Sequence, residues 1–326
     1  MRRAFHLLIL LLVCALPACK GPSEPGTLAP NEDRQPRVPR QVLAFYYPWY
    51  GSPTGPSQRW FHWNPASPRP AGYDAVHVPK LGYYDSADTA VIRQHVRWAK
   101  EAGVDAFIAS WWGQGTFEDG VMPALMRIAE EEKFQVTVFL EEAPSRAILR
   151  GQVEYLLARY GSSPAWLRAD GRPVIFVYTR VINELSEADM VAAFEGTGVF
   201  AVGDGASFGK AAPFDGVCFY NPSGDPGSYI GALPGVIRDQ HRAGRIVAAA
   251  VMPGYDDTGY RTPGSILARG NGAAYRRFWR EAPAADWVTI TSFNEWHEGS
   301  EIEPSVEDGT TYLDLTRSLG DAWRGE

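Results

Sequence analysis

Cysteine is scarce in this sequence, with three among 326 residues. Two of them, Cys14 and Cys19, lie close to the N-terminus, so Cys218 stands alone in the rest of the chain. No disulfide framework is therefore available to stabilise a small fold. Cys218 lies in an apolar run, which predicts a buried packing residue rather than a reactive thiol. The main domain must rest on a hydrophobic core, and the chain is long enough to build one.

Basic residues are in the minority as well. The chain has 31 Lys and Arg against 38 Asp and Glu, a formal net charge of −7. An acidic chain without a basic stripe is not expected to bind nucleic acid. Aromatic residues, in contrast, are plentiful at 13%, with 11 tryptophans.

The N-terminal residues have the features of an export signal. Arg2 and Arg3 precede the apolar run Leu7–Val13, which is too short to span a bilayer stably. The following Leu16-Pro17-Ala18-Cys19 resembles the bacterial lipobox, in which the cysteine is acylated and becomes the new N-terminus. The alternative is an ordinary signal peptide that has a cysteine there by chance.

This interpretation divides the chain into three parts. We expect a lipoprotein signal peptide over residues 1–18, a lipid on Cys19, and a tether over residues 19–40 rich in Pro, Gly and charge. Residues 41–326 would form one domain at the cell envelope, attached to the membrane only through the lipid. We expect this domain to be a monomer.

Eight short apolar runs follow the tether. They are Val42–Tyr47, Val104–Trp112, Gln135–Glu141, Pro173–Tyr178, Val199–Gly203, Val217–Tyr220, Ile246–Met252 and Trp287–Phe293. Continuous apolar runs, rather than alternating ones, are typical of parallel strands that are covered on both faces.

Helical patterns lie between most of these runs. They are Ala87–Ala102, Val121–Glu132, Arg146–Tyr160, Glu187–Phe194, Tyr229–Ala243, Ala273–Glu281 and Tyr312–Trp323. The fifth repeat is weak, because Gly203–Phe214 has no convincing helix. The alternation predicts a single (β/α)8 TIM barrel with long βα loops. A doubly wound sheet is the alternative, but no Gly-x-Gly-x-x-Gly turn follows the first strand.

Aromatic and carboxylate residues gather where the predicted strands end, which is where such barrels place their active sites. We expect substrate contacts from Tyr46, Tyr47, Trp49, Trp111, Trp112, Glu141, Glu142, Tyr178, Tyr220, Tyr255, Asp256, Asn294, Trp296 and His297, and from His62 in the long loop 48–85. Sugar rings stack on aromatic side chains, and cleavage of a glycosidic bond needs two carboxyl groups. The pattern therefore favours a glycan as the substrate.

Glu295 and Glu298 are the candidate catalytic pair. They follow the last predicted strand three residues apart, and both can face one pocket if the chain turns there. Such pairs also decorate many exposed helices, but the surrounding Trp296 and His297 favour a functional role. For the nearby Glu301 and Glu303 we expect structural salt bridges.

Other polar residues allow two interpretations each. Adjacent strand residues point apart, so only one of Glu141 and Glu142 should enter the pocket. Asp256 and the neighbouring Asp257 bind sugar hydroxyls or fix their loop through Asx turns. His62, His297, Asp256 and Glu298 could ligate a metal, but no His-x-x-x-His spacing supports this, and we expect no metal and no cofactor.

Five motifs resemble glycoside hydrolase family 99, the family of endo-α-1,2-mannosidases and endo-α-1,2-mannanases. They lie at Phe45–Gly51, Pro79–Ser86, Trp111–Gly113, Pro253–Thr258 and Ser292–Gly299, and the similarity extends over residues 41–316. The resemblance implies a metal-independent, retaining enzyme in which the substrate's own 2-hydroxyl is the nucleophile. Glu295 would assist that hydroxyl, Glu298 would be the general acid/base, and Glu141 or Glu142 would be a third carboxylate.

The leading hypothesis is an endo-acting hydrolase of α-mannosidic linkages in mannan or mannose-rich glycans. One alternative is a hydrolase of a different α-linked glycan, and another is a non-catalytic glycan-binding lipoprotein. A protein of polysaccharide assembly is disfavoured, because an exported domain has no access to cytoplasmic sugar nucleotides.

Overall fold

The computed structural model describes residues 38–67, 69, 72–205, 209–259 and 261–325. The expected signal peptide, Cys19 and most of the expected tether lie outside the described residues. Within the described part of the chain, no helix combines the length and the apolar character needed to cross a membrane.

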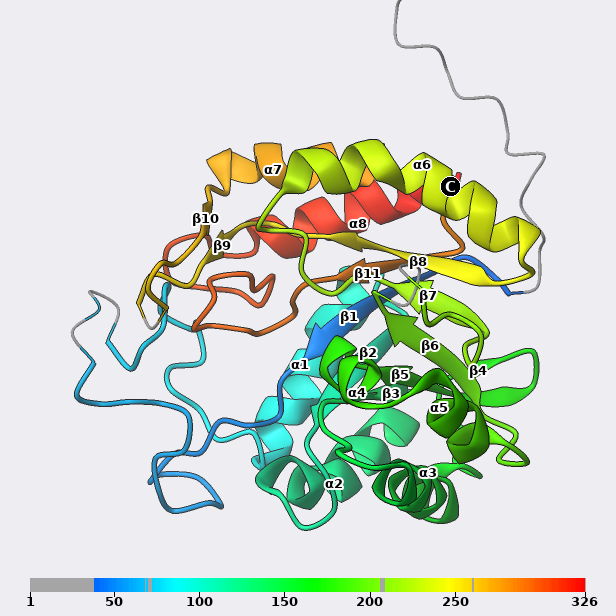
Figure 1. The fold of residues 1–326 in the computed structure, drawn as a ribbon. Coiled ribbons are helices and arrows are strands. Elements are labelled where there is room, and N and C mark those ends of the chain that lie inside the picture. The colour runs from blue at the N-terminus through cyan, green and yellow to red at the C-terminus, as the bar shows by residue number, and fades with distance from the viewer. Residues whose placement is uncertain (1–37, 68, 70–71, 206–208, 260, 326) are drawn as a thin grey trace, which may run out of the picture. The chain divides into compact units, whose positions relative to one another are not determined.

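Eight parallel strands of the described residues close into a barrel (Figure 1). They are β1 (Gln41–Tyr46), β2 (Ala106–Trp111), β3 (Gln135–Leu140), β5 (Arg172–Val177), β6 (Phe200–Asp204), β7 (Gly216–Cys218), β8 (Ile246–Val251) and β11 (Trp287–Ile290). The last strand pairs with the first, Gln41 opposite Trp287, and β3 pairs with β5. Each of the eight apolar runs overlaps one of these strands, with bounds that differ by a few residues at most, so the predicted (β/α)8 barrel is confirmed.

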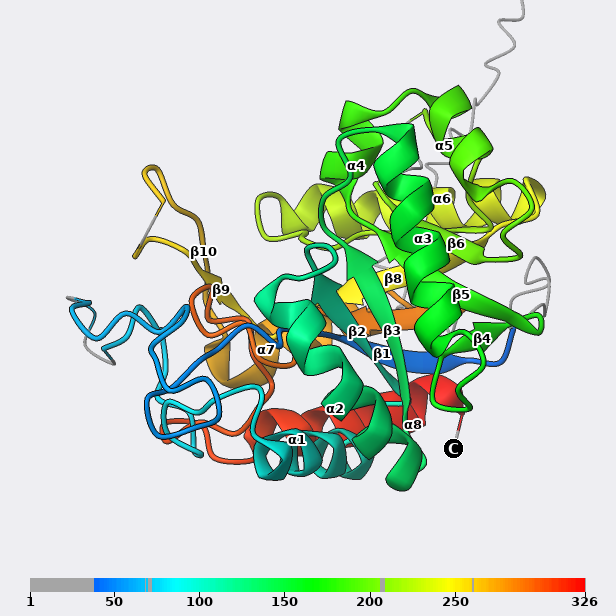
Figure 2. The same ribbon diagram turned by 90° about the horizontal axis from the view of Figure 1, so that it is seen from below.

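Helices cover the outside of the barrel (Figure 2). They are α1 (Thr89–Glu101), α2 (Phe117–Glu131), α3 (Arg146–Tyr160), α4 (Thr179–Glu184), α5 (Glu187–Phe194), α6 (Pro226–Arg242), α7 (Ala273–Arg280), preceded by the 3-10 turn η2 (Gly270–Gly272), and α8 (Thr311–Arg324). The helix α2 begins four residues earlier than predicted, because the Thr116 hydroxyl caps it by accepting from the amide of Asp119. The short α4 was not predicted, and the described residues between β6 and β7 contain no helix, as expected.

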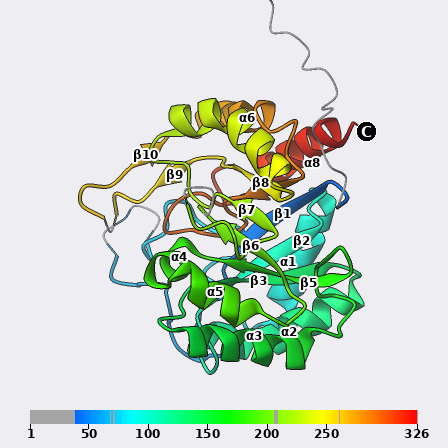
Figure 3. The same cartoon turned by 45° about the vertical axis from the view of Figure 1, so that its right-hand side comes forward.

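Short antiparallel elements and long loops complete the fold. The strand β4 (Arg168–Ala169) extends β5, and β9 (Tyr255–Asp256) pairs with β10 (Ile266–Leu267). The loop after β1, the β9–β10 hairpin and the segment after β11 gather at one end of the barrel, on the left of Figure 1 and again in Figure 3. These segments all follow the carboxyl ends of strands, so this end is where a TIM barrel places its site.

The barrel has two cores, and alternate residues of each strand belong to different ones. Along β1, Ala44 and Tyr46 pack against the surrounding helices, whereas Phe45 and Tyr47 pack inside the barrel. This alternation follows from the period of two in a strand. It decides which of the residues at each strand end can reach the pocket.

Candidate active site

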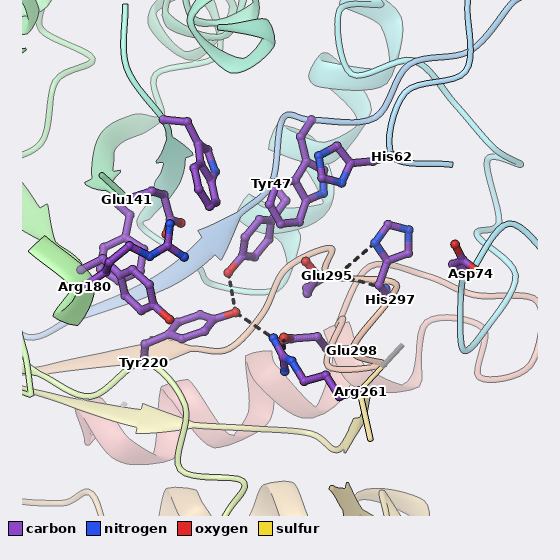
Figure 4. A pocket seen from close by; sticks show the side chains of 14 residues that line it. Tyr47, His62, Asp74, Glu141, Arg180, Tyr220, Arg261, Glu295, His297 and Glu298 are labelled. Carbon is purple, nitrogen blue, oxygen red and sulfur yellow. Dashed lines mark hydrogen bonds and ion pairs between the residues drawn. The ribbon is translucent and has the colours of Figure 1, made fainter. Parts of the chain in front are cut away.

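A pocket of about 500 Å³ lies at the carboxyl end of the barrel (Figure 4). Its lining residues are Tyr47, Trp49, His62, Asp74, Trp112, Phe139, Glu141, Tyr178, Arg180, Tyr220, Arg261, Glu295, His297 and Glu298. These residues come from the ends of six barrel strands, from the long loop after β1 and, for Arg261, from the loop between β9 and β10. The pocket therefore brings together ten of the seventeen side chains expected at the site.

The chain after β11 places both candidate catalytic carboxylates in this pocket. Residues 296–299 form a turn, so Glu295 and Glu298 face the same side, as the catalytic hypothesis requires. The turn is fixed from within, because the backbone amide of Glu295 donates to the Ser292 hydroxyl at 2.7 Å. The amide of His297 donates to Oε1 of Glu295 at 3.0 Å. Glu295 is thus oriented by backbone geometry before any ligand binds.

Burial dominates the electrostatics around Glu295. Its side chain is 3% exposed, and burial together with the nearby Glu298 carboxylate raises the pKa of Glu295 well above its usual range. Burial also lowers the pKa of His297 to about 4. Near neutral pH, His297 is therefore uncharged and gives Glu295 no compensating positive charge.

Glu298 has a different environment. Nη1 of Arg261 lies 3.0 Å from its Oε1, and the Tyr220 hydroxyl donates to its Oε2 at 3.4 Å. The Tyr47 hydroxyl in turn donates to that of Tyr220. Arg261 also pairs with Asp257 at 2.7 Å. The two glutamates of one turn thus differ in charge environment, which is how one site gives two carboxyl groups two roles.

The end of β3 contributes a third carboxyl group. Glu141 continues the inward-facing side of the strand, whereas Glu142 points the other way and is exposed. The Ser110 hydroxyl donates to Oε1 of Glu141 at 2.8 Å. Burial raises the pKa of Glu141 to about 8. At neutral pH this group is mostly protonated and can donate a hydrogen bond to a ligand.

The loop after β1 forms one wall of the pocket. Trp49 stacks on His62 with ring centroids 4.3 Å apart and an interplanar angle of 8°. Burial, and to a smaller extent His297, lowers the pKa of His62 to about 4. Asp74 joins these residues at the rim (Figure 4). The wall thus presents flat, uncharged rings to the pocket, a surface suited to stacking on a sugar.

Two of the expected contact residues face the outer core instead. Tyr46 is fully buried, and its hydroxyl is bonded to Nδ1 of His95 at 3.1 Å. Trp111 is fully buried and donates to Asp119 at 3.1 Å. The expectation that they contact substrate is therefore corrected, because each has the wrong strand parity, whereas Trp112 lines the pocket.

Two residues of the last motif lie beneath the pocket and support it. The side chain of Asn294 bonds the backbone of Tyr47 twice, accepting from its amide at 2.7 Å and donating to its carbonyl at 3.0 Å. Trp296 is fully buried, and its Nε1 donates to Glu303 at 3.2 Å. Both were expected to contact substrate, but neither reaches the pocket.

The Asp256 region stabilises its own loop. Asp256 accepts from the amide of Thr258 at 3.0 Å. This contact is an Asx turn, one of the two roles that the sequence allowed for Asp256. The Tyr255 hydroxyl donates to Asp257 at 3.0 Å. Neither Tyr255 nor Asp256 lines the pocket, so their expected role as contact residues is also corrected. This loop serves the site by placing Arg261 against Glu298.

Of the two acidic residues after the turn, Glu301 forms the expected structural ion pair, and Glu303 bonds to a buried histidine. Glu301 pairs with Arg269 and lies 2.7 Å from Nδ1 of His77. Glu303 lies 3.1 Å from Nε2 of His95, and both side chains are fully buried. Cys218 is buried and unbonded to any other cysteine of the described chain, which agrees with its predicted packing role.

Sequence reasoning missed Arg180, Arg261, Asp74 and Phe139. Phe139 precedes Glu141 by two residues on the same strand, so the period of the strand was a usable signal for it. Arg180 lies in the short helix α4, which the sequence did not predict. Asp74 and Arg261 lie in loops, where no periodic signal exists. Over the described residues, no group of three or more His, Cys, Asp or Glu side chains could hold a metal ion.

Comparison with known proteins agrees with this geometry. The family model "Glycosyl hydrolase family 99" matches residues 38–204 and 211–323. A human glycoprotein endo-alpha-1,2-mannosidase-like protein is 29% identical, over 85% of this chain and 72% of its own length. The rat glycoprotein endo-alpha-1,2-mannosidase is 26% identical, over 87% of this chain and 72% of its own length. The solved structure of a GH99 endo-alpha-mannosidase from Bacteroides thetaiotaomicron is 25% identical with a TM-score of 0.76, over 87% of this chain and 97% of that one.

Proposed function

Because the chain belongs to glycosyl hydrolase family 99, we propose that this glycoside hydrolase cleaves α-mannosidic linkages within mannan or mannose-rich glycans, with retention of configuration. The observation that supports it best is that Glu295 and Glu298 line one pocket in different charge environments. The names of the relatives make α-1,2 linkages the first to test. Hydrolysis of a different α-linked glycan by the same chemistry is the alternative.

In the first step, Glu295 takes the proton of the sugar's 2-hydroxyl, and that oxygen attacks the anomeric carbon. The bond to the leaving oxygen breaks as Glu298 protonates it, and a 1,2-anhydro sugar forms. In the second step, Glu298 takes a proton from water, which attacks the anomeric carbon, and Glu295 returns its proton to the 2-oxygen. Two inversions give net retention, and the steps need no metal, as the family resemblance implies.

The environments of the two carboxyl groups do not by themselves favour this assignment. Burial raises the pKa of Glu295 and so disfavours its ionised form, whereas Glu298 has the guanidinium of Arg261 3.0 Å from its Oε1. The side chain of Arg261 is 49% exposed and can therefore move aside when the substrate binds. Glu298 can act as the acid only if Arg261 is displaced in this way. The roles of the two glutamates therefore need a direct test.

Substrates with good and poor leaving groups separate the roles. A good leaving group needs little proton donation, so Glu298→Gln should keep more of its first-step rate with an activated aryl α-mannoside than with a mannan oligosaccharide. Glu295→Gln should lose rate on both alike. Glu101→Gln, which changes an exposed glutamate at the end of α1 that lines neither the pocket nor any neighbouring hollow, is the control that should lose neither. If the activated substrate rescues Glu295→Gln instead, the two roles are exchanged.

A 2-fluoro substrate tests the participation of the 2-hydroxyl. Without that hydroxyl, even the unmodified enzyme should turn the substrate over poorly. A direct carboxylate nucleophile would instead trap a glycosyl adduct on Glu295, which mass spectrometry of the intact protein would detect. Screening α-mannans and other α-glycans with product analysis tests the substrate class itself. Failure to cleave any α-mannoside would reject the proposal.

A further inference from the structure

A second hollow of about 450 Å³ opens beside the pocket, with Trp112 as a wall of both. It lies between the ends of β2 and β3 and the first turns of α3. We call this hollow the outer groove and define it by Trp112, Gln114, Glu142, Ile148, Gly151 and Gln152. The adjacent residues Glu141 and Glu142 thus serve neighbouring hollows, one in the pocket and one in the outer groove.

Trp112 is held in place between the two hollows. Its Nε1 donates to the Ser110 hydroxyl at 3.1 Å, and that hydroxyl donates to Glu141. The guanidinium of Arg180 lies over its ring, 4.9 Å from the centroid. A fixed aromatic partition of this kind can contact one sugar on each side.

The outer groove offers both kinds of contact that a sugar uses. Ile148 is 44% exposed and gives the groove an apolar surface. Glu142 is an exposed carboxylate that can accept from hydroxyls. Nε2 of Gln152 donates to the carbonyl of Glu142 at 3.0 Å, which holds the amide at the groove.

The other amide atom of Gln152 is unsatisfied. Its Oε1 is enclosed, yet it accepts no hydrogen bond from any described residue. A buried acceptor without a donor is unfavourable. A sugar hydroxyl in the outer groove would supply the donor after a small rotation of the amide.

Gly151 lies in the lining of the outer groove and keeps it open. It lies inside α3, where glycine is less favourable than alanine. A Cβ built on it would meet nothing within 4 Å, and its φ is not positive, so neither crowding nor the backbone requires glycine. What glycine does there is leave the outer groove without a side chain.

We propose that the outer groove is an additional sugar-binding subsite, which holds the next residue of a glycan whose neighbouring residue lies in the pocket against Trp112. The subsite extends the proposed function and rests on it. Its occupant is a further mannose residue of the same α-linked chain. The enzyme should therefore prefer chains long enough to fill both hollows.

Filling the outer groove tests this proposal. The substrates are an aryl α-mannobioside and manno-oligosaccharides lengthened at the non-reducing or, separately, the reducing end. The unmodified enzyme should gain about three- to tenfold in kcat/KM when one lengthened series reaches the outer groove, as one or two new hydrogen bonds would give. Gly151→Leu should abolish this gain and leave the rate on the mannobioside unchanged.

Gly231→Leu is the matched control. Gly231 lies inside α6, is exposed, and also has open space around a built Cβ, but it does not line the outer groove. Both substitutions should raise thermal stability, because leucine favours a helix. Only Gly151→Leu should lose the preference for long chains, so loss of folding cannot explain the result.

A second pair of variants isolates the hydrogen bond. Gln152→Met should reduce the gain from chain lengthening, whereas Gln240→Met, which removes another enclosed amide oxygen without a partner in the described chain, should not. Two results would overturn the subsite and leave the proposed function intact. One is a preference for long chains that survives Gly151→Leu, and the other is the absence of such a preference in the unmodified enzyme. Absence of cleavage and binding of every α-mannoside would instead overturn the proposed function.

Discussion

Replacing Glu141 with glutamine should stabilise the protein at alkaline pH and leave it little changed in acid. The Glu141 side chain is 5% exposed, and burial raises its pKa from 4.5 to about 8. The Ser110 hydroxyl lowers this pKa but does not offset the desolvation. A glutamine side chain at this position would keep the shape and hydrogen-bonding capacity of the protonated form without an ionisable group.

The sign and size of the effect follow from proton linkage. Between pH 4.5 and about 8, the folded state binds more protons at Glu141 than the unfolded state does, so stability falls as the pH rises. One pKa unit corresponds to ~1.36 kcal/mol, so Glu141 should cost about 4 kcal/mol more at about pH 9 than at about pH 5. The Glu141→Gln variant should lack this loss.

Urea unfolding over a pH series measures the difference. The free energy of unfolding of Glu141→Gln minus that of the unmodified protein should rise steadily from about pH 5 to about pH 9. Other buried carboxyl groups contribute equally to both proteins and largely cancel. Glu142→Gln is the control, because that exposed neighbour should give a flat difference. Parallel pH profiles for Glu141→Gln and the unmodified protein would refute the reasoning.

Two further predictions concern residues outside the pocket. Glu303→Leu should destabilise the protein by about 3–5 kcal/mol and lower kcat, because it leaves His95, Tyr84 and Trp296 without their buried partner. Glu303→Gln can still accept from Tyr84 and Trp296, so its loss of unfolding free energy, measured in urea, should be clearly smaller. Equal losses for the two variants would contradict this supporting role of Glu303. Cys19→Ala should release the protein from the membrane fraction without changing the specific activity of the domain, and undiminished membrane association would reject the proposed lipid anchor.

Strand periodicity accounts for most of what the sequence could predict about the site. Continuous apolar runs predicted all eight barrel strands, because strands covered on both faces carry apolar residues at every position. The same runs hide which residues face inward, and this led to Tyr46 and Trp111 being expected in the pocket. Adjacent strand residues point apart, which is the argument used for Glu141 and Glu142. The same argument would have excluded Tyr46 and Trp111 from the pocket, since their neighbours Tyr47 and Trp112 face inward.

Tertiary contacts between loops account for what the sequence could not predict. Arg261 reaches Glu298 from a loop that Asp257 fixes by accepting from the amide of Ser265 at 2.6 Å. Asp74 joins the rim from the loop after β1. Such positions depend on turns and long-range hydrogen bonds rather than on periodicity. The motif around Glu295 identified the site, but only the structure shows which of its residues contact the pocket and which support it.

The charge of the pocket favours an uncharged glycan over an anionic one. Burial raises the pKa of Glu141 to about 8, so this carboxyl group is largely protonated near neutral pH, and burial also raises the pKa of Glu295 well above its usual range. His62 and His297, with pKa values lowered to about 4, are uncharged under the same conditions. The carboxylate of Glu298 is paired with Arg261. The pocket of this acidic protein thus combines aromatic rings and hydroxyls with two carboxyl groups whose ionised forms are disfavoured by burial, and these groups can form hydrogen bonds with sugar hydroxyls.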